Sequence, residues 1–462
     1  MPSRYLRPGS PTDDLRADFE RIRAEFDVTI GFPDDVAAEA EERARAPVDP
    51  AGRVDLTGVP WVTIDPPGSM DLDQAMQLER TADGFVVRYA IADVAAHVPP
   101  GSLLEQEAWK RGTTVYCPDT KAPLYPTSLS EGAASLLPDE TRPAIVFTIQ
   151  LDAEGERTAA RVERATVRST AKLAYGSAEV PHLEEVGRLR MAIARRRGAV
   201  SLNAPAQEVV ADPSSPLGYR LELEPRVESE DWNAEISLLA GMAAADLMAE
   251  RGFGLLRVMG GADEYRLTRL RRVAHGLHVE WPEDEPYRDF VDRLDPAKPR
   301  DAAILEEARG VMGHASYLYF DGAPPKDAIH AGIAARYAHT TAPLRRLADR
   351  YVLDLLAGGG DRSALERLPE AMAEAQTRAG RVEHAMIDLM ETRLLEHRIG
   401  ERFEATPLED DRRGTVIQIA EPPVRARLHA DPPPPLGRRV AVLLVRADPR
   451  SRSLEFRPAT TS

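Results

Sequence analysis

The sequence has a single cysteine and no long apolar run, and each shortage argues against a class of protein. Cys117 is the only cysteine among 462 residues, so no internal disulfide and no cysteine-based zinc cluster can form. No stretch approaches 18 consecutive apolar residues, which argues against a membrane-spanning helix. Residues 1–8 also lack the apolar core of a secretory signal. We therefore expect a cytoplasmic protein with no membrane partner.

Basic residues are outnumbered, since 59 Lys and Arg face 75 Asp and Glu and the net charge is −16. An acidic protein is an unusual partner for nucleic acid, because phosphate backbones attract basic surfaces. Net charge does not describe a local channel, however. Arg336, Arg345, Arg346 and Arg350 fall within fifteen residues. This cluster is typical either of a solvated helix face or of a phosphate-binding surface.

A chain of this length is expected to form two or three domains. Apolar spacing predicts helices over residues 13–27, 36–46, 102–111, 232–251, 301–318, 340–357 and 365–401, the last with a break near Gly380. β-prone runs predict strands over residues 75–79, 85–94, 143–151, 414–419, 424–428, 438–445 and 453–456. The first two strands would form a hairpin across Asp83-Gly84. The last four suit a small OB-type barrel.

Three carboxylates occur within nine residues, directly after a short β-prone run. Asp71 and Asp73 are two positions apart, so on an extended backbone they point to one face. The turn at residues 66–68 lets the chain bring Asp65 beside them. Converging carboxylates repel one another without a cation, and oxygen-only ligation suits magnesium or manganese. Magnesium beside a phosphodiester indicates hydrolysis or transfer at phosphorus.

The same residues are open to two other interpretations. Asp, Pro, Gly and Ser also make ordinary solvated turns. A short Asp-x-Asp also holds manganese in sugar-nucleotide transferases, although no recognisable nucleotide-binding βα unit surrounds residues 71–73. His97, His330 and His339 are more typical of structural histidines than of ligands or bases. Asp93, in an apolar strand, is typical of a buried, hydrogen-bonded carboxylate.

Longer motifs along residues 54–400 resemble the RNase II/RNase R (RNB) family of RNA exonucleases. They follow one another in family order, as RVDLT at residue 53, TIDPPGSMDLD at 63, YAIADVAAHV at 89, GSLLEQEAWKRGTTVY at 101, LYPTSLS at 124, SLLPDETR at 135, RGAV at 197, EISLLA at 235 and YAHTTAPLRR at 337. The resemblance implies an α+β fold. Its parts would be a helical N-terminal region over residues 1–53, a catalytic domain over 54–402 with helices around a mixed sheet, and an OB-type RNA-binding barrel over 403–462.

The resemblance also implies a function and a metal site. The expected activity is magnesium-dependent 3′→5′ hydrolysis of single-stranded RNA to 5′-mononucleotides. In the family an aspartate cluster binds magnesium at the scissile phosphate, and Asp65, Asp71 and Asp73 match three of its four positions. Gln74 matches the fourth. We expect these four residues to bind Mg²⁺, or Mn²⁺, with the aspartates acting in catalysis.

Four further residues are candidates for RNA contacts. Arg345 matches the phosphate-contacting arginine of the Ser-Pro-Ile-Arg motif, and Arg346 follows it as a second substrate-binding arginine. Arginine suits this task because its planar fork grips two phosphate oxygens. Tyr116 matches the tyrosine that stacks on the 3′-terminal nucleotide, although alone it would suggest a core tyrosine. Glu235 matches an acidic residue of the substrate channel, and capping or pairing with an arginine is an equal alternative.

The chain departs from the family pattern in three places. Gln74 replaces the second of two adjacent aspartates, and an amide oxygen brings no charge to a metal site. Ala342 replaces the serine of Ser-Pro-Ile-Arg. Residues 1–53 are too few to encode the two cold-shock domains that usually precede the catalytic domain. The alternative function is therefore a catalytically weakened family member that acts mainly as an RNA-binding module. The sequence identifies no protein partner.

Overall fold

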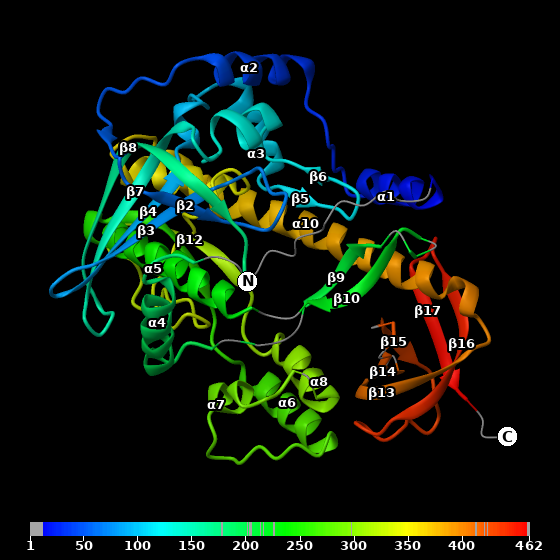
Figure 1. The fold of residues 1–462 in the computed structure, drawn as a ribbon. Helices are drawn as coiled ribbons and strands as arrows, with labels where there is room; N and C mark the ends of the chain where they lie inside the picture. The colour runs from blue at the N-terminus through cyan, green and yellow to red at the C-terminus, as the bar shows by residue number, and fades with distance from the viewer. Residues whose placement is uncertain are drawn as a thin grey trace.

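The structure of the chain is a computed structural model. It describes residues 13–176, 179–200, 202, 206–212, 214–215, 217–224, 227–296, 298–411, 414–419, 421–422 and 424–459. Figure 1 shows a body of sheet and helices, a small helical module below it and a β-barrel, with the long helix α10 running from the body to the barrel.

Six strands form the central sheet, in the order β1-β8-β2-β3-β4-β7. Their bounds are β1 Val54–Asp55, β2 Trp61–Ile64, β3 Gln74–Arg80, β4 Gly84–Ala92, β7 Thr141–Asp152 and β8 Arg157–Leu173. The long strand β8 pairs with β7 along its first part and with β1 and β2 further on, so the sheet curls back on itself. Gly84 opens β4 at φ 150°, and a Cβ there would lie 2.1 Å from the carbonyl oxygen of Leu151. Only glycine permits this close pairing.

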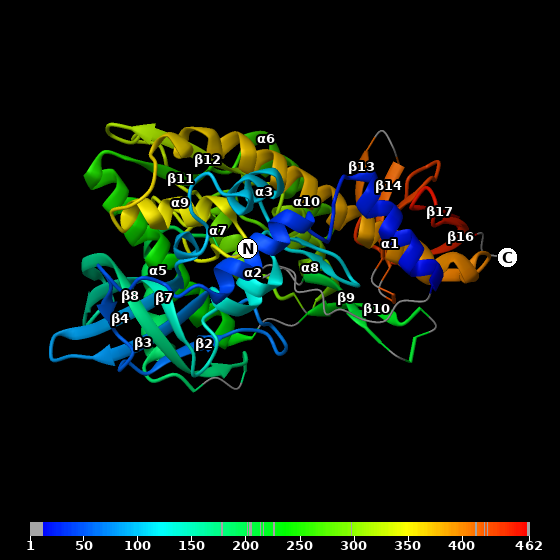
Figure 2. The same cartoon turned by 90° about the horizontal axis from the view of Figure 1, so that it is seen from above.

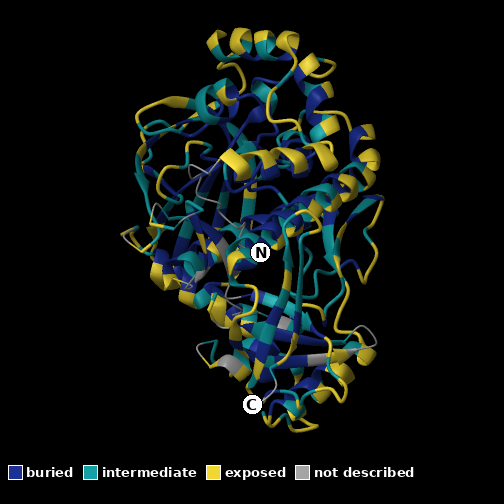
Figure 3. Cartoon of the chain, turned by 90° about the vertical axis from the view of Figure 1, so that its right-hand side faces the viewer, coloured by how far each residue is buried: buried dark blue, intermediate teal, exposed yellow. Residues whose placement is uncertain are grey.

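Helices pack against the sheet, and the helices in Figure 3 are exposed on their outward faces and buried on the faces turned toward the protein. Strands β4 and β7 are mostly buried, whereas β1 is exposed and β8 is largely half-buried or exposed. The helices of the body are α2 Asp34–Arg45, α3 Leu103–Arg111, α4 Leu183–Arg197, α5 Glu228–Arg251 and α9 Leu347–Leu356. The apolar helix α5 is buried along most of its second half. A Cβ at Gly241 would lie 2.2 Å from the ring of Tyr337, so this glycine lets the segment before α9 pack directly on α5.

Smaller elements connect these layers. Three two-stranded pairs consist of β5 Val115–Tyr116 with β6 Lys121–Ala122, β9 Ala206–Ala211 with β10 Tyr219–Glu224, and β11 Phe253–Met259 with β12 Ala315–Asp321. The helical module consists of α6 Glu264–Gly276, α7 Tyr287–Asp292 and α8 Pro299–Ala308. Single turns occur at Val94–Ala96, Leu129–Ala133 and Glu396–Arg398.

The C-terminal strands close into the barrel β13-β14-β15-β17-β16. Their bounds are β13 Arg402–Asp411, β14 Gly414–Ile419, β15 Val424–Leu428, β16 Val440–Asp448 and β17 Ser453–Pro458. Phe403, Ile417, Val442 and Phe456 fill the interior. This closed barrel confirms the predicted OB-type barrel, and the sheet with its helices confirms the predicted α+β class.

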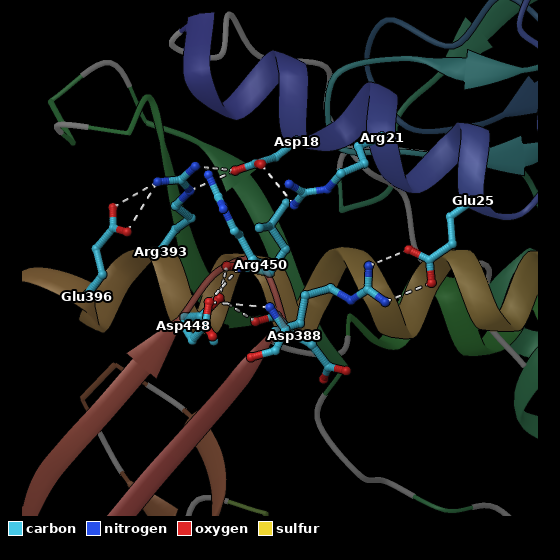
Figure 4. A network of polar contacts seen from close by, with 12 residues as sticks. Asp18, Arg21, Glu25, Asp388, Arg393, Glu396, Asp448 and Arg450 are labelled. Carbon is cyan, nitrogen blue, oxygen red and sulfur yellow. Dashed lines mark hydrogen bonds and ion pairs between the residues drawn. The ribbon is translucent and has the colours of Figure 1, made fainter.

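The N-terminal helix α1 (Asp13–Glu25) lies beside α10 (Ser363–Leu395) and the barrel (Figure 2). Its apolar face packs into the same buried cluster as α10 and the barrel strands. Figure 4 shows the polar rim of this contact, where Asp18 of α1 accepts hydrogen bonds from Arg393 of α10. Glu25 pairs with Arg452, which lies in the turn between β16 and β17, at 2.7 Å. Helix α1 therefore joins the body to the barrel.

The predicted elements are confirmed except at three places. The predicted helix over 301–318 ends at Ala308, and residues 315–321 form strand β12 instead. Residues 340–346 are not helical, and α10 passes through Gly380 without a break. The sequence analysis also made no prediction for strands β8 to β11 or for helices α4, α6 and α7. Among the described residues, no helix is both long enough and apolar enough to cross a membrane.

Candidate active site

Asp65, Asp71 and Asp73 lie on one segment between β2 and β3, which we call the acidic loop (residues 65–73). The buried hydroxyl of Ser135 forms two hydrogen bonds with its second half. The amide of Leu72 donates to Ser135 Oγ at 2.9 Å, and that hydroxyl donates to the carbonyl of Met70 at 2.6 Å. The backbone between the carboxylates is thus fixed by a residue more than sixty positions away.

Asp73 joins the acidic loop to the Arg345 segment. The residue is 3% exposed, and its Oδ1 accepts a hydrogen bond from the Leu344 amide at 2.8 Å. Its Oδ2 accepts one from Arg345 Nε at 3.1 Å. Burial raises the pKa of Asp73 to about 7, although the Arg345 charge and the Leu344 amide both act to lower it. The predicted catalytic aspartate and the predicted phosphate-binding arginine therefore lie in direct contact.

Asp349 on α9 shapes the turn that carries Arg345. Its fully buried Oδ2 accepts hydrogen bonds from the Ala342 amide at 2.8 Å and from Arg346 Nη2 at 2.8 Å. Arg350, 3% exposed, donates to the Val98 carbonyl at 2.7 Å. Arg346 and Arg350 are thus engaged inside the protein, and the interpretation of this cluster as a solvated helix face is wrong for both.

The carbonyl of Arg345 ties the same turn to strand β5. It accepts hydrogen bonds from the amide of Thr114 at 3.0 Å and from Thr113 Oγ1 at 2.9 Å. Two residues further on, Tyr116 ends β5 with a half-buried side chain. The predicted base-stacking residue and the predicted phosphate-binding residue are therefore held on one hydrogen-bonded unit.

Asp71 faces a lysine that the sequence analysis did not identify. Lys121 Nζ lies 3.1 Å from Asp71 Oδ1 and 2.8 Å from Glu131 Oε1. Lys121 is the register partner of Tyr116 in the β5–β6 hairpin. Burial acts to lower the pKa of Lys121, but the two carboxylates outweigh it and raise that pKa above its usual value. The ammonium is therefore charged at neutral pH.

Among the predicted metal ligands, two oxygen atoms are buried without a hydrogen-bond partner, Asp65 Oδ2 and Gln74 Oε1. Burial raises the pKa of Asp65 to about 6, with a further contribution from Asp71, against the lowering effects of Arg345 and Lys172. A buried acceptor without a donor costs about 1–3 kcal/mol. Both orphaned atoms are oxygens, the donors that Mg²⁺ and Mn²⁺ prefer.

The residues present therefore fit an oxygen-ligated divalent cation. The fit rests on the two orphaned oxygens and on carboxylates whose ionised forms burial disfavours. Within the described part of the chain, no three His, Cys, Asp or Glu side chains form a metal-binding group as they stand. Asp71 and Asp73 are turned instead toward Lys121 and Arg345. The assignment of Asp65, Asp71, Asp73 and Gln74 as metal ligands remains a prediction.

Glu235 lies on α5, half-buried, and faces arginines of α4. Its charge acts to raise the pKa values of Arg190 and Arg197, both of which burial lowers. These charge interactions fit the alternative of arginine pairing. The role of Glu235 in substrate binding, like that of Arg346, remains a prediction.

Asp93 and His339, two of the remaining polar residues singled out in the sequence, have structural partners. Asp93 is buried and pairs with Arg53 at 2.7 Å and with Arg164 at 2.6 Å, which confirms its interpretation as a structural carboxylate. His339 Nδ1 lies 2.7 Å from the hydroxyl of Tyr317. Burial lowers the pKa of His339 well below its usual value, so the ring is neutral.

Sequence reasoning missed Lys121, Asp349 and Thr113. Lys121 and Asp349 lie close to recognised motifs, five residues after Tyr116 and four after Arg345. Thr113 falls inside the motif that ends at Tyr116. A lysine in a short loop carries no signal of its partner, because a contact with Asp71 depends on how two separate loops fold. The proximity of these residues to predicted site residues was the only available indication.

Comparisons with known proteins define first the class of this chain and then its family. A model of the RNB domain matches residues 53–358, and a model of the RNase II-type exonuclease C-terminal S1 domain matches residues 401–459. The chain is thus built as a catalytic-type domain followed by an S1-type barrel. It belongs to the RNB family.

Ribonuclease R of Escherichia coli (strain K12) is 29% identical over 324 residues. That match covers 65% of this chain but 39% of the E. coli protein. Ribonuclease R of Aquifex aeolicus (strain VF5) is 28% identical over 436 residues, covering 86% of this chain and 60% of that protein. The chain therefore spans less than two thirds of the length of either relative.

Solved structures show the same fold. The apo form of Mycoplasma genitalium RNase R matches with a TM-score of 0.85 at 20% identity, over 97% of this chain and 78% of that one. The same protein is also solved with ribose methylated single-stranded RNA. Yeast Ssd1, described as a pseudonuclease, matches with a TM-score of 0.66 at 19% identity, over 85% of this chain and 53% of that one.

Proposed function

We propose that this chain is a divalent-cation-dependent 3′→5′ exoribonuclease that hydrolyses single-stranded RNA to 5′-mononucleotides. Membership of the RNB family and the likeness to proteins named ribonuclease R support the reaction class. The RNA complex of the M. genitalium protein supports single-stranded RNA as the ligand. The observation that carries the proposal is the contact of Asp73 in the acidic loop with Arg345. The proposal includes cytoplasmic residence, because a chain with a single cysteine forms no internal disulfide and suits a reducing compartment.

Each group of side chains has a separate role in the proposed reaction. Asp65, Asp71, Asp73 and Gln74 would hold Mg²⁺ or Mn²⁺, which supplies Lewis-acid assistance to the attack of water on phosphorus. Arg345 offsets negative charge on the phosphoryl oxygens as it develops in the transition state. Its fork reaches two oxygens at once.

Tyr116 positions the end of the strand. An aromatic ring stacks on any base, so this contact fits a sequence-tolerant enzyme. Because the Arg345 carbonyl bonds to Thr113 and Thr114, a base stacked on Tyr116 and a phosphate on Arg345 would be held at a fixed separation. Such fixed geometry favours reaction at one terminal linkage.

A labelled-RNA assay tests the proposal. Single-stranded RNA with a 5′ label is incubated with the protein in Mg²⁺, in Mn²⁺ and in EDTA, with Asp73→Asn as the control for contaminating nucleases. We expect a ladder that shortens from the 3′ end, 5′-mononucleotide products, and no degradation in EDTA or by the variant. Internal cleavage, or a ladder that persists in EDTA, would refute it.

The alternative is a weakened enzyme that acts mainly as an RNA-binding module. Gln74 favours it because one ligand brings no charge, and Lys121 favours it because a cation would compete with an ammonium for Asp71. The fold shared with the pseudonuclease Ssd1 is compatible with it. In the same assay this alternative predicts retention of RNA without any ladder, in Mg²⁺ and in Mn²⁺.

A further inference from the structure

Lys121 is placed to act on the acidic loop as a built-in cation. Its ammonium contacts Asp71 at 3.1 Å and Glu131 at 2.8 Å, and the three side chains are 26%, 16% and 28% exposed, respectively. Ion pairs at this depth are less screened by solvent than surface pairs. The ammonium therefore exerts a substantial field on Asp71.

The other carboxylates of the loop show why this matters. Asp73 is paired with Arg345, whose guanidinium is also the group suited to phosphate. Asp65 Oδ2 and Gln74 Oε1 are buried without partners. The predicted ligand set thus has three carboxylates in the acidic loop and one neutral amide, Gln74, at the start of β3, where a fourth negative charge would increase cation binding. One of the three carboxylates, Asp71, is already paired with Lys121.

We propose that Lys121 is a resident counter-ion that competes with divalent cations for Asp71 and so sets the affinity of the site for them. The inference rests on the proposed function in that the same acidic loop binds the cation. It deepens that proposal by naming a residue, outside the predicted ligand set, that controls cation binding.

Glu131 is a second carboxylate partner for the Lys121 ammonium. When Asp71 turns to a cation, Lys121 keeps its contact with Glu131 and stays inside the protein. Lys121 can therefore release Asp71 without moving its charged side chain into solvent. Glu131 belongs to the short helical turn Leu129–Ala133, which is separate from the acidic loop, so its place does not depend on the orientation of Asp71.

The test is a Mn²⁺ titration of the full chain without RNA, with free Mn²⁺ followed by electron paramagnetic resonance. Lys121→Met removes the charge and keeps most of the stem, and we expect about tenfold tighter Mn²⁺ binding, since one unit charge beside a ligand carboxylate is removed. Lys121→Arg should bind Mn²⁺ like the parent. Lys110→Met removes a lysine that is 73% exposed on α3, and it should have no effect.

A double-mutant cycle distinguishes direct competition for Asp71 from a general change in the electrostatic field at the metal site. In an Asp71→Asn background, Lys121→Met should change Mn²⁺ affinity less than twofold. An equal gain in that background would overturn the inference, as would unchanged or weaker binding in Lys121→Met alone. Folding of each variant is checked by melting in EDTA, and Lys121→Gln carries the same expectation if the methionine variant does not fold.

This experiment stands apart from the test of the proposed function because it contains no RNA. If Mn²⁺ binding tightens in Lys121→Met but no RNA is degraded, the inference holds and the exoribonuclease proposal fails. If RNA is degraded but the Mn²⁺ affinity is the same in the parent and in Lys121→Met, the exoribonuclease proposal holds and the inference about Lys121 fails.

Discussion

Asp73→Asn should separate stability from activity. The substitution removes the charge of a residue that is 3% exposed and keeps the shape of its side chain. We expect it to abolish RNA degradation, because a predicted cation ligand and a partner of Arg345 are lost. We also expect the variant to be more stable than the parent in EDTA, since it no longer keeps a carboxylate ionised in a buried position.

The raised pKa of Asp73 gives the size of the expected change in the free energy of unfolding. Burial raises the pKa of Asp73 from 3.8 to about 7. Below about pH 3.8 the group is protonated in both the folded and the unfolded chain, so no penalty exists there. The penalty develops as the pH rises and is complete above about 7, where it reaches roughly 4 kcal/mol at about 1.4 kcal/mol per pH unit. Asparagine avoids this penalty, but its NH₂ group faces Arg345 Nε and loses an acceptor, which costs about 1–3 kcal/mol.

The net expectation is a gain of about 1–3 kcal/mol at pH 8, seen as a rise of a few °C in Tm. Thermal unfolding of parent and variant is measured at pH 8 in EDTA and again in Mg²⁺. Added Mg²⁺ should stabilise the parent and leave Asp73→Asn unchanged, and RNA affinity should stay within about a few-fold because stacking and backbone contacts remain. Asp83→Asn, at the exposed β3–β4 turn, serves as the control.

Two results would refute this reasoning. A lower Tm for Asp73→Asn in EDTA would mean that its pairing with Arg345 outweighs the cost of burial. Degradation at the parent rate would mean that Asp73 is neither a cation ligand nor required to position Arg345.

Four further predictions follow from the site. Arg345→Lys should strongly impair turnover despite the conserved charge, because an ammonium cannot grip two phosphate oxygens; unchanged kinetics would contradict this. Tyr116→Ala should lengthen the final product, since one lost stack is worth about 1–3 kcal/mol and short RNAs have few other contacts; an unchanged end product would argue for a core role. Gln74→Asp should lower the Mg²⁺ concentration for half-maximal activity, and a higher requirement would show that the surroundings are adapted to an amide. Because the pKa of Asp65 is raised to about 6 and that of Asp73 to about 7, protons compete with cations there, so Mn²⁺ should raise Tm more at pH 8 than at pH 5.5; an equal rise at both pH values would count against a site at these carboxylates.

Local sequence patterns predicted the regular elements well where local propensity and packing agree. The hairpin β3–β4 and the barrel strands carry strong β-propensity and turn signals, and they form as expected. The segment 340–346 shows the limit. Its composition favours a helix, but two of its amides are bound by the side chains of Asp73 and Asp349, which holds the backbone in a turn. Residues 315–321 are a strand because they pair with β11, more than fifty positions away.

The sequence by itself determined the family and the residue types of the candidate site, because motif order and spacing are properties of the chain. Only the tertiary structure decided which charges face each other. Asp73 and Arg345 are 272 positions apart, and Lys121 reaches Asp71 from a different hairpin. Such pairings depend on how separate loops pack on the sheet, and no local spacing encodes that. The sequence shows three aspartates that could bind a cation, whereas the fold shows that two of them already have cationic partners and that one has a buried oxygen without a partner.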